Sequence, residues 1–317
     1  MAESGASALS PAPSVRSPLV HAERFVWLHA RVLEQRLFAH RFLNGGADPV
    51  ERALDAYRNE DGGYGHALEP DLRGPVSQPL HTGHALGVLD AIGRCGGQRV
   101  ERVCRYLTSV STADGALPAV GPGRHGYPTA PYVRVADHPP SDLLATGPVV
   151  GLLHRNEVWH AWLFRATDFC WRAVESLEQA RPGEIEAAVA FLDAVPDRPR
   201  AEAAADRLGR LVRTQRLATP TADRSPDRPV GAGHASGERS FGRFPHDFAR
   251  TPRSLARAWF TDGEMARSLD LLAAQQQEDG GWPNRRPEWA PGAALETRGM
   301  ATIEALRTLQ AHGRHVG

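Results

Sequence analysis

The residues best suited to chemistry in this sequence lie in one Gly- and Pro-rich stretch. Its two acidic side chains, Glu69 and Asp71, flank a proline, which restricts Glu69 to an extended conformation. Mutual repulsion between carboxylates this close would raise one pKa and leave that group protonated near neutral pH, as a general acid requires. We therefore predict that Asp71 is a catalytic acid and that Glu69 supports it.

Basic and imidazole side chains accompany this acidic pair. Arg73 is suited to bind an anionic group of a substrate or to neutralise one carboxylate. His66 precedes the pair, and His81 and His84 follow it, three residues apart on one face of an expected helix. We predict a catalytic role for His81 and substrate-binding roles for His66, Arg73 and His84.

A purely structural role is the alternative for all of these side chains. The carboxylates would then cap helix ends or pair with the nearby arginine, and buried histidines with satisfied hydrogen bonds are common. Two histidines three residues apart are a weak metal signal, so we predict no metal site. The sequence identifies no cofactor.

A recurring turn indicates which elements must position these residues. Its copies are Asp61-Gly62-Gly63-Tyr64-Gly65, Glu278-Asp279-Gly280-Gly281-Trp282 and the weaker Asp114-Gly115-Ala116-Leu117-Pro118. Each turn follows an expected helix and precedes an irregular stretch and a second helix, which opens at Thr82, Thr146 or Thr297. The separations from Asp to Thr are 21, 32 and 18 residues. Helix-hairpin repeats produce this pattern, because one hairpin cannot bury its apolar face alone.

Aligning the second helices by their threonines extends the candidate site. His81, Ala145 and Glu296 each stand immediately before the threonine. We therefore expect Glu296 to enter the same cavity as His81 and predict a catalytic role for it. The side chains expected to line the mouth of this cavity are Arg285, Arg286, Glu288, Trp289 and Arg298, of which Trp289 and Arg298 are predicted to bind substrate.

The repeat resembles those of two known families. Gln276-Gln277-Glu278-Asp279-Gly280-Gly281-Trp282 matches the Q-x-x-D-G-G-W repeat of squalene and terpenoid cyclases. The first turn, followed by Thr82-x-x-Ala85-Leu86, is similar to the repeat of the protein prenyltransferase β-subunit. The resemblance implies an all-α fold, a single (α/α) toroid of about five to six helical hairpins over residues 19–317. It also implies that the Asp-Gly-Gly turns staple helices together on the outside and are not catalytic.

The resemblance does not extend to the catalytic motifs of these families. The D-x-D-D acid motif of class II terpenoid cyclases is absent, and Glu69-Pro70-Asp71 matches only part of it. The D-D-x-x-D metal motif of class I enzymes is also absent, and the zinc ligands of prenyltransferases cannot be mapped. The stretch from Pro245 to Glu296 resembles a group of actinobacterial toroid proteins as well, which implies no particular activity.

Three functions remain open from the sequence. The first is a terpenoid cyclase-like enzyme that acts on an isoprenoid substrate by acid-initiated cyclisation or isomerisation. The second is a glycan-acting hydrolase or lyase of the α/α-toroid type, with Glu69, Asp71 and Glu296 as acid and base. The third is a non-catalytic toroid that binds a small ligand. All three imply a small-molecule partner, an isoprenoid or a glycan in the enzymatic cases.

Composition narrows the class of protein. Among 317 residues, 37 Lys and Arg balance 37 Asp and Glu, so no basic excess favours nucleic acid as a partner. Three cysteines without CxxC spacing favour a reducing cytoplasm. No stretch approaches the roughly 18–20 apolar residues of a membrane span. Residues 1–18 are expected to form a disordered tail without an export signal, and residues 219–240 a flexible excursion.

Overall fold

The computed structural model describes residues 17–121, 126–133, 142–219 and 243–317. Within these residues the regular secondary structure is helical, and the few β-bridges are isolated. The predicted all-α class is therefore confirmed. The predicted tail and the predicted excursion at 219–240 lie almost entirely outside the described residues, although Pro18 already belongs to the first helix.

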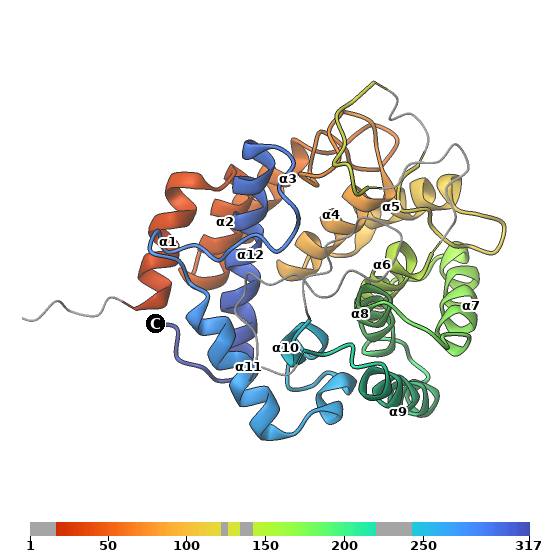
Figure 1. Ribbon diagram of the computed structural model, residues 1–317. Coiled ribbons are helices and arrows are strands. Elements are labelled where there is room, and N and C mark those ends of the chain that lie inside the picture. Colours follow the sequence, from red (N-terminus) through yellow and green to blue (C-terminus); the bar gives the residue numbers. More distant parts are fainter. Residues whose placement is uncertain (1–16, 122–125, 134–141, 220–242) are drawn as a thin grey trace, which may run out of the picture.

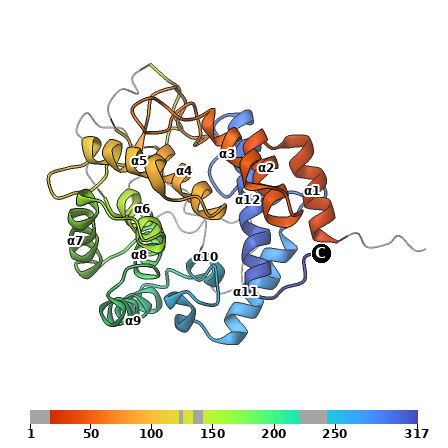
Figure 2. The same cartoon turned by 180° about the vertical axis from the view of Figure 1, so that it is seen from behind.

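The helices are arranged in a ring (Figure 1). They are α1 (Pro18–His29), α2 (Val32–Phe42), α3 (Ala47–Asp55), α4 (Pro79–Ala91), α5 (Gly97–Val110), α6 (Leu143–Arg155), α7 (Ala161–Glu175), α8 (Pro182–Leu192), α9 (Arg198–Thr214), α10 (Pro245–Phe248), the 3-10 helix η1 (Leu255–Trp259), α11 (Asp262–Ala274) and α12 (Pro291–Ala311). Seen from either side, α4, α6, α8 and α12 lie nearer the middle, and α5, α7, α9 and α11 lie on the rim (Figures 1 and 2).

Packing proceeds from one helix to the next around the ring. In the described residues α2 packs on α3, α4 on α5, α6 on α7, α8 on α9 and α10 on α11, and α12 returns to α1. This arrangement agrees with the predicted toroid of five to six hairpins. None of the described helices combines the length and the apolar character that crossing a bilayer requires.

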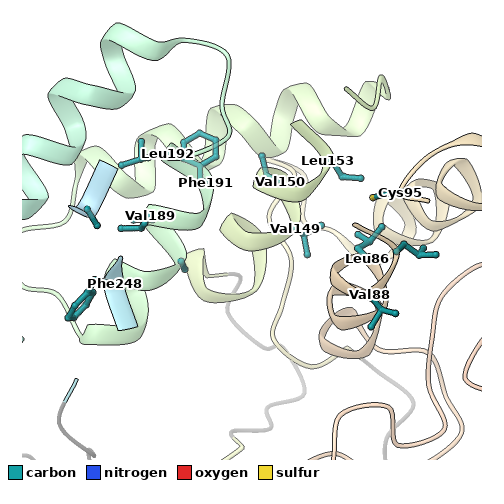
Figure 3. Packing of buried hydrophobic residues seen from close by; sticks show 14 of the residues in the cluster. Leu86, Val88, Cys95, Val149, Val150, Leu153, Val189, Phe191, Leu192 and Phe248 are labelled. Atoms are coloured by element: carbon teal, nitrogen blue, oxygen red, sulfur yellow. The ribbon is translucent and has the colours of Figure 1, made fainter. Parts of the chain in front are cut away.

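The inner helices α6 and α8 make the closest contact in the core. A Cβ atom at Gly151 would collide with the carbonyl oxygen of Ala190, so glycine is what allows these two backbones to approach. Apolar side chains fill the space on either side of this contact, as Figure 3 shows for Val150 of α6 and Phe191 of α8. The inner wall of the ring is therefore a continuous packed core.

One hydrogen bond of the recurring turn is present in every copy. Its first glycine has a positive φ, for example +91° at Gly62 and +93° at Gly280, which favours glycine over any other residue. The backbone N–H of the residue three positions after the turn's aspartate then donates to a threonine hydroxyl of the next inner helix. These bonds join Tyr64 to Thr82 (3.1 Å), Leu117 to Thr146 (2.9 Å) and Trp282 to Thr302 (3.0 Å).

The threonine of the third copy is thus Thr302, and the predicted alignment on Thr297 is wrong. Thr297 donates only to the carbonyl of Ala293, one turn earlier in its own helix. The counterpart of His81 is therefore Ala301, so His81 and Glu296 are not equivalent. The reason is that α12 begins about three turns before its threonine, whereas α4 begins about one turn before Thr82.

The turns also close the ring. The backbone at Gly62 packs against Arg102 of α5, which is the next rim helix along the chain. Gly280 packs in the same way against His21, so α1 takes the place of the next rim helix after α12. The N–H of Leu19 donates to the carbonyl of Val316 at 2.8 Å and ties the two ends of the described chain together.

We predict that Thr302→Val lowers the free energy of unfolding by about 1–3 kcal/mol, because it leaves the buried N–H of Trp282 without an acceptor. Thr297→Val is the matched control. It removes a hydroxyl of the same helix that accepts no such bond, and we expect it to cost less than about 1 kcal/mol. Urea unfolding of the two variants measures both values, and equal losses would contradict the assignment of Thr302 as the staple.

Candidate functional site

The loop of residues 66–75 precedes α4 in the sequence and is held in place by hydrogen bonds to other parts of the chain. The guanidinium of Arg31, at the start of α2, donates to the carbonyls of Ala67 (3.1 Å) and Leu68 (3.0 Å). Ala67 has a φ of +60°, which is unfavourable for a residue with a side chain and persists only where the surroundings hold it. The loop therefore presents its side chains in a defined orientation.

The other side of this loop pairs with residues 128–130. The N–H of Ala130 donates to the carbonyl of Asp71 at 2.8 Å, and the N–H of Arg73 donates to the carbonyl of Pro128 at 2.9 Å. With Arg31 on one side and this pairing on the other, the backbone on both sides of the acidic pair is anchored. Both Glu69 and Asp71 are buried as a result.

Asp71 accepts hydrogen bonds from three side chains of two distant segments. Tyr132 donates its hydroxyl at 2.7 Å, Arg286 its guanidinium at 2.6 Å and Trp289 its indole N–H at 3.2 Å. Only 4% of Asp71 is exposed. Its carboxylate is thus held in one orientation. Burial, together with the hydrogen bond to Asp71, raises the pKa of the Tyr132 phenol.

Glu69 binds two histidines of α4. Its side chain lies 2.6 Å from Nδ1 of His84, and its backbone N–H donates to Nδ1 of His81 at 2.8 Å. Its second oxygen lies 3.5 Å from the guanidinium of Arg286, which thereby faces both carboxylates. We call Glu69, Asp71, His81, His84 and Arg286 the carboxylate cluster.

Electrostatics keep Glu69 ionised. Burial by itself raises the pKa of its carboxyl, but the charge and the hydrogen bond of His84, with the charge of Arg286, lower it to about 2. Glu69 is therefore ionised at neutral pH, because the effects of His84 and Arg286 together outweigh that of burial. Burial lowers the pKa of His81 to about 4, so this imidazole is neutral at pH 7.

Glu296 lies beside the cluster, within a second network of charges. Arg73 binds it at 3.0 Å, and Arg31 approaches it to 3.9 Å while binding Glu34 of α2 at 2.5 Å. Glu296 therefore contacts the loop of residues 66–75 through Arg73, and its position in the repeat differs from that of His81. The guanidinium of Arg73 is thus paired with this carboxylate rather than with Asp71 or Glu69.

Two predicted substrate-binding residues lie elsewhere. His66 is exposed, and its Nε2 lies 2.9 Å from the amide oxygen of Asn59, within the first turn. Arg298 binds Asp279 of the third turn at 2.7 Å and stacks on the ring of Phe25 at 4.5 Å. The structure joins neither side chain to the carboxylate cluster. Trp289, in contrast, contacts it directly.

Two residues that bind Asp71 are difficult to predict from the sequence. Tyr132 lies in a Pro-rich stretch without periodicity, so nothing local relates it to Asp71. Arg286 was expected at the mouth of the cavity, but its pairing with both acids depends on a contact 215 positions along the chain. The adjacent Arg285 instead binds Asp247 at 2.7 Å, so the two arginines hold one loop to two parts of the ring.

Other features of the described residues lie apart from the cluster. A hollow of about 320 Å³ on the rim is lined by Arg58, Asn59, Glu60, Gly62, Arg99 and Arg102 and contains no member of the cluster. No group of three or more His, Cys, Asp or Glu side chains in the described part of the chain is arranged to hold a metal ion.

Solved structures share this architecture. A protein from Actinoplanes is 16% identical with a TM-score of 0.58, over 92% of this chain and 98% of that one. A variant of the type II terpene cyclase MstE from Scytonema, in complex with geranylgeranyl dihydroxybenzoate, is 14% identical with a TM-score of 0.51, over 95% of this chain and 90% of that one. At such identities the likeness establishes a terpene cyclase-like fold. No family model and no curated protein matches the sequence.

We predict that the stabilising effect of Glu69 disappears in acid. Its folded-state pKa of about 2 lies below the ordinary value of 4.5, so ionised Glu69 stabilises the fold above about pH 4.5, and this stabilisation is lost as the pH falls towards 2. The difference in unfolding free energy between wild type and Glu69→Gln should therefore shrink from pH 6 to pH 3. Urea unfolding across this range measures it. Glu60→Gln, at an exposed position, is the control, and a difference for Glu69→Gln that does not change with pH would contradict the assignment.

Proposed function

We propose that this protein is a terpenoid cyclase-like enzyme that acts on an isoprenoid small molecule by acid-initiated cyclisation or isomerisation, with Asp71 as the proton donor. The observation that carries the proposal is the fixed, buried carboxyl of Asp71, held by Tyr132, Arg286 and Trp289. Proton transfer to one carbon of a flexible chain requires a donor in a defined position. The fold is shared with an enzyme whose solved complex contains geranylgeranyl dihydroxybenzoate.

The hydrogen-bond donors around Asp71 stabilise the carboxylate that remains after the proton transfer. When the carboxylic acid protonates an alkene, its O–H bond breaks, a C–H bond forms, and a carboxylate and a carbocation remain. The O–H of Tyr132 and the N–H groups of Arg286 and Trp289 already point at this carboxylate and need no reorganisation to stabilise it. Loss of a proton from the carbocation completes an isomerisation without net change in composition.

Glu69 has a different role in this proposal. Because its pKa is held at about 2, it stays ionised and cannot be the proton donor. A buried negative charge next to the acid favours the positive charge that develops on the substrate. The glycan-acting alternative would use the same two carboxyls, and a comparison of substrates separates it from the isoprenoid one.

A second candidate is a toroid that binds an isoprenoid without converting it. The observation in its favour is Arg286, whose guanidinium lies 2.6 Å from Asp71 and 3.5 Å from Glu69. Catalysis by Asp71 requires that it takes up a proton in spite of this charge. Binding and turnover must therefore be measured separately.

We expect the protein to be stabilised against heat by farnesyl diphosphate, geranylgeranyl diphosphate or geranylgeranyl dihydroxybenzoate and to convert the bound compound to an isomer of equal mass. Asp71→Asn keeps the shape of the side chain but has no acidic proton, so it should retain the thermal shift and lose turnover by at least about 100-fold. Asp168→Asn, at an exposed position on α7, is the matched control. Liquid chromatography with mass detection follows the reaction.

Each result separates the candidates. Binding without turnover by the wild type supports the non-catalytic toroid. A thermal shift with oligosaccharides alone supports the glycan-acting alternative, and turnover that survives in Asp71→Asn contradicts the role given to this acid.

A further inference from the structure

Glu69 contacts two histidines through two different groups. Its backbone N–H donates to Nδ1 of His81, and its carboxylate lies 2.6 Å from Nδ1 of His84. The histidines stand three residues apart on α4, so their side chains lie on the same face of the helix. One residue thus determines the hydrogen-bonding state of both rings.

The contact between Glu69 and His81 makes Nε2, the other ring nitrogen of His81, a hydrogen-bond donor. A backbone N–H can only donate, so Nδ1 of His81 is the acceptor and the ring proton of the neutral imidazole is on Nε2. Burial lowers the pKa of His81 to about 4, which keeps the ring neutral. Its Nε2 is buried and has no hydrogen-bond partner in the described residues, and only 1% of the residue is exposed. A buried donor without an acceptor is rare and points to a missing partner.

The contact to His84 has the opposite effect. Ionised Glu69 can only accept, so Nδ1 of His84 carries a proton. In the neutral ring the lone pair then lies on Nε2, which is an acceptor. The side chain of His84 is 14% exposed, so a ligand can reach it. The two rings therefore present one N–H donor and one nitrogen acceptor on one helix face.

We propose that His81 and His84, fixed in opposite tautomers by Glu69, form a binding subsite for a hydroxyl group. The oxygen of such a group accepts from Nε2–H of His81, and its proton is donated to Nε2 of His84. A carboxylate or an ether has no proton to donate, and the ionised Glu69 beside the subsite disfavours an anion. This subsite lies within the site of the proposed function. It depends on that function only for the expectation that the rest of the ligand is an isoprenoid.

Nitrogen-15 spectra of the histidine rings test the tautomers without any turnover. We expect His81 with its proton on Nε2 and the neutral form of His84 with its proton on Nδ1, assigned by the loss of signals in His81→Gln and His84→Gln. Glu69→Gln keeps the backbone N–H, so His81 should be unchanged, while His84 loses its preference for the Nδ1–H form. The opposite tautomer at either ring overturns the proposal.

Phenol and anisole test the hydroxyl subsite. They differ only in the methyl group that replaces the phenolic proton, and neither is an isoprenoid, so the result is independent of the proposed function. We expect millimolar phenol to shift the Nε2 resonances of both rings in the wild type and anisole to leave that of His84 unchanged. In His84→Phe the shift at His81 should be at least several-fold weaker. Equal responses to both compounds, or none to phenol, overturn the hydroxyl subsite, whereas failure of all isoprenoids to bind overturns the proposed function alone.

Discussion

The guanidinium of Arg286 is the interaction on which the candidate site depends. Two buried carboxylates, Asp71 and Glu69, face it at 2.6 and 3.5 Å. Buried charges without a partner cost several kcal/mol each, and this guanidinium is a partner that both acids share. Arg286 also belongs to the loop before α12, while the acids precede α4. The same contact therefore supplies charge to the site and holds two distant parts of the chain together.

The scaffold that makes this contact possible is a ring closed by repeated local geometry. Each copy of the turn combines a left-handed glycine with a backbone N–H on a threonine of the next inner helix. Because Gly280 packs on His21 as Gly62 packs on Arg102, the last hairpin meets the first helix. The loop before α12 is consequently brought next to the loop before α4. Closure of the ring therefore brings Arg286 of one loop to Asp71 and Glu69 of the other.

The comparison with solved structures concerns the fold, whereas the chemistry of the site is described by the contacts of this chain's own side chains. The likeness to MstE concerns the arrangement of helices, at 14% identity. Glu69 is held ionised and orders the two histidines, whereas Asp71 is oriented by Tyr132 and Trp289. This division of tasks between two neighbouring acids follows from their different partners.

The sequence by itself determined the turns, the all-α class and the proximity of Glu69 to Asp71, because steric limits on glycine and hydrogen bonds between near neighbours act over a few residues. It also contained the correct third threonine, since Thr302-x-x-Ala305-Leu306 repeats the pattern that starts at Thr82. Only the tertiary structure decided that His84 and Arg286 together lower the pKa of Glu69 and that Glu296 pairs with arginines. Coulomb interactions depend on distance in space, and a charge 215 positions away along the chain lies within hydrogen-bonding distance of Asp71 once the ring is closed.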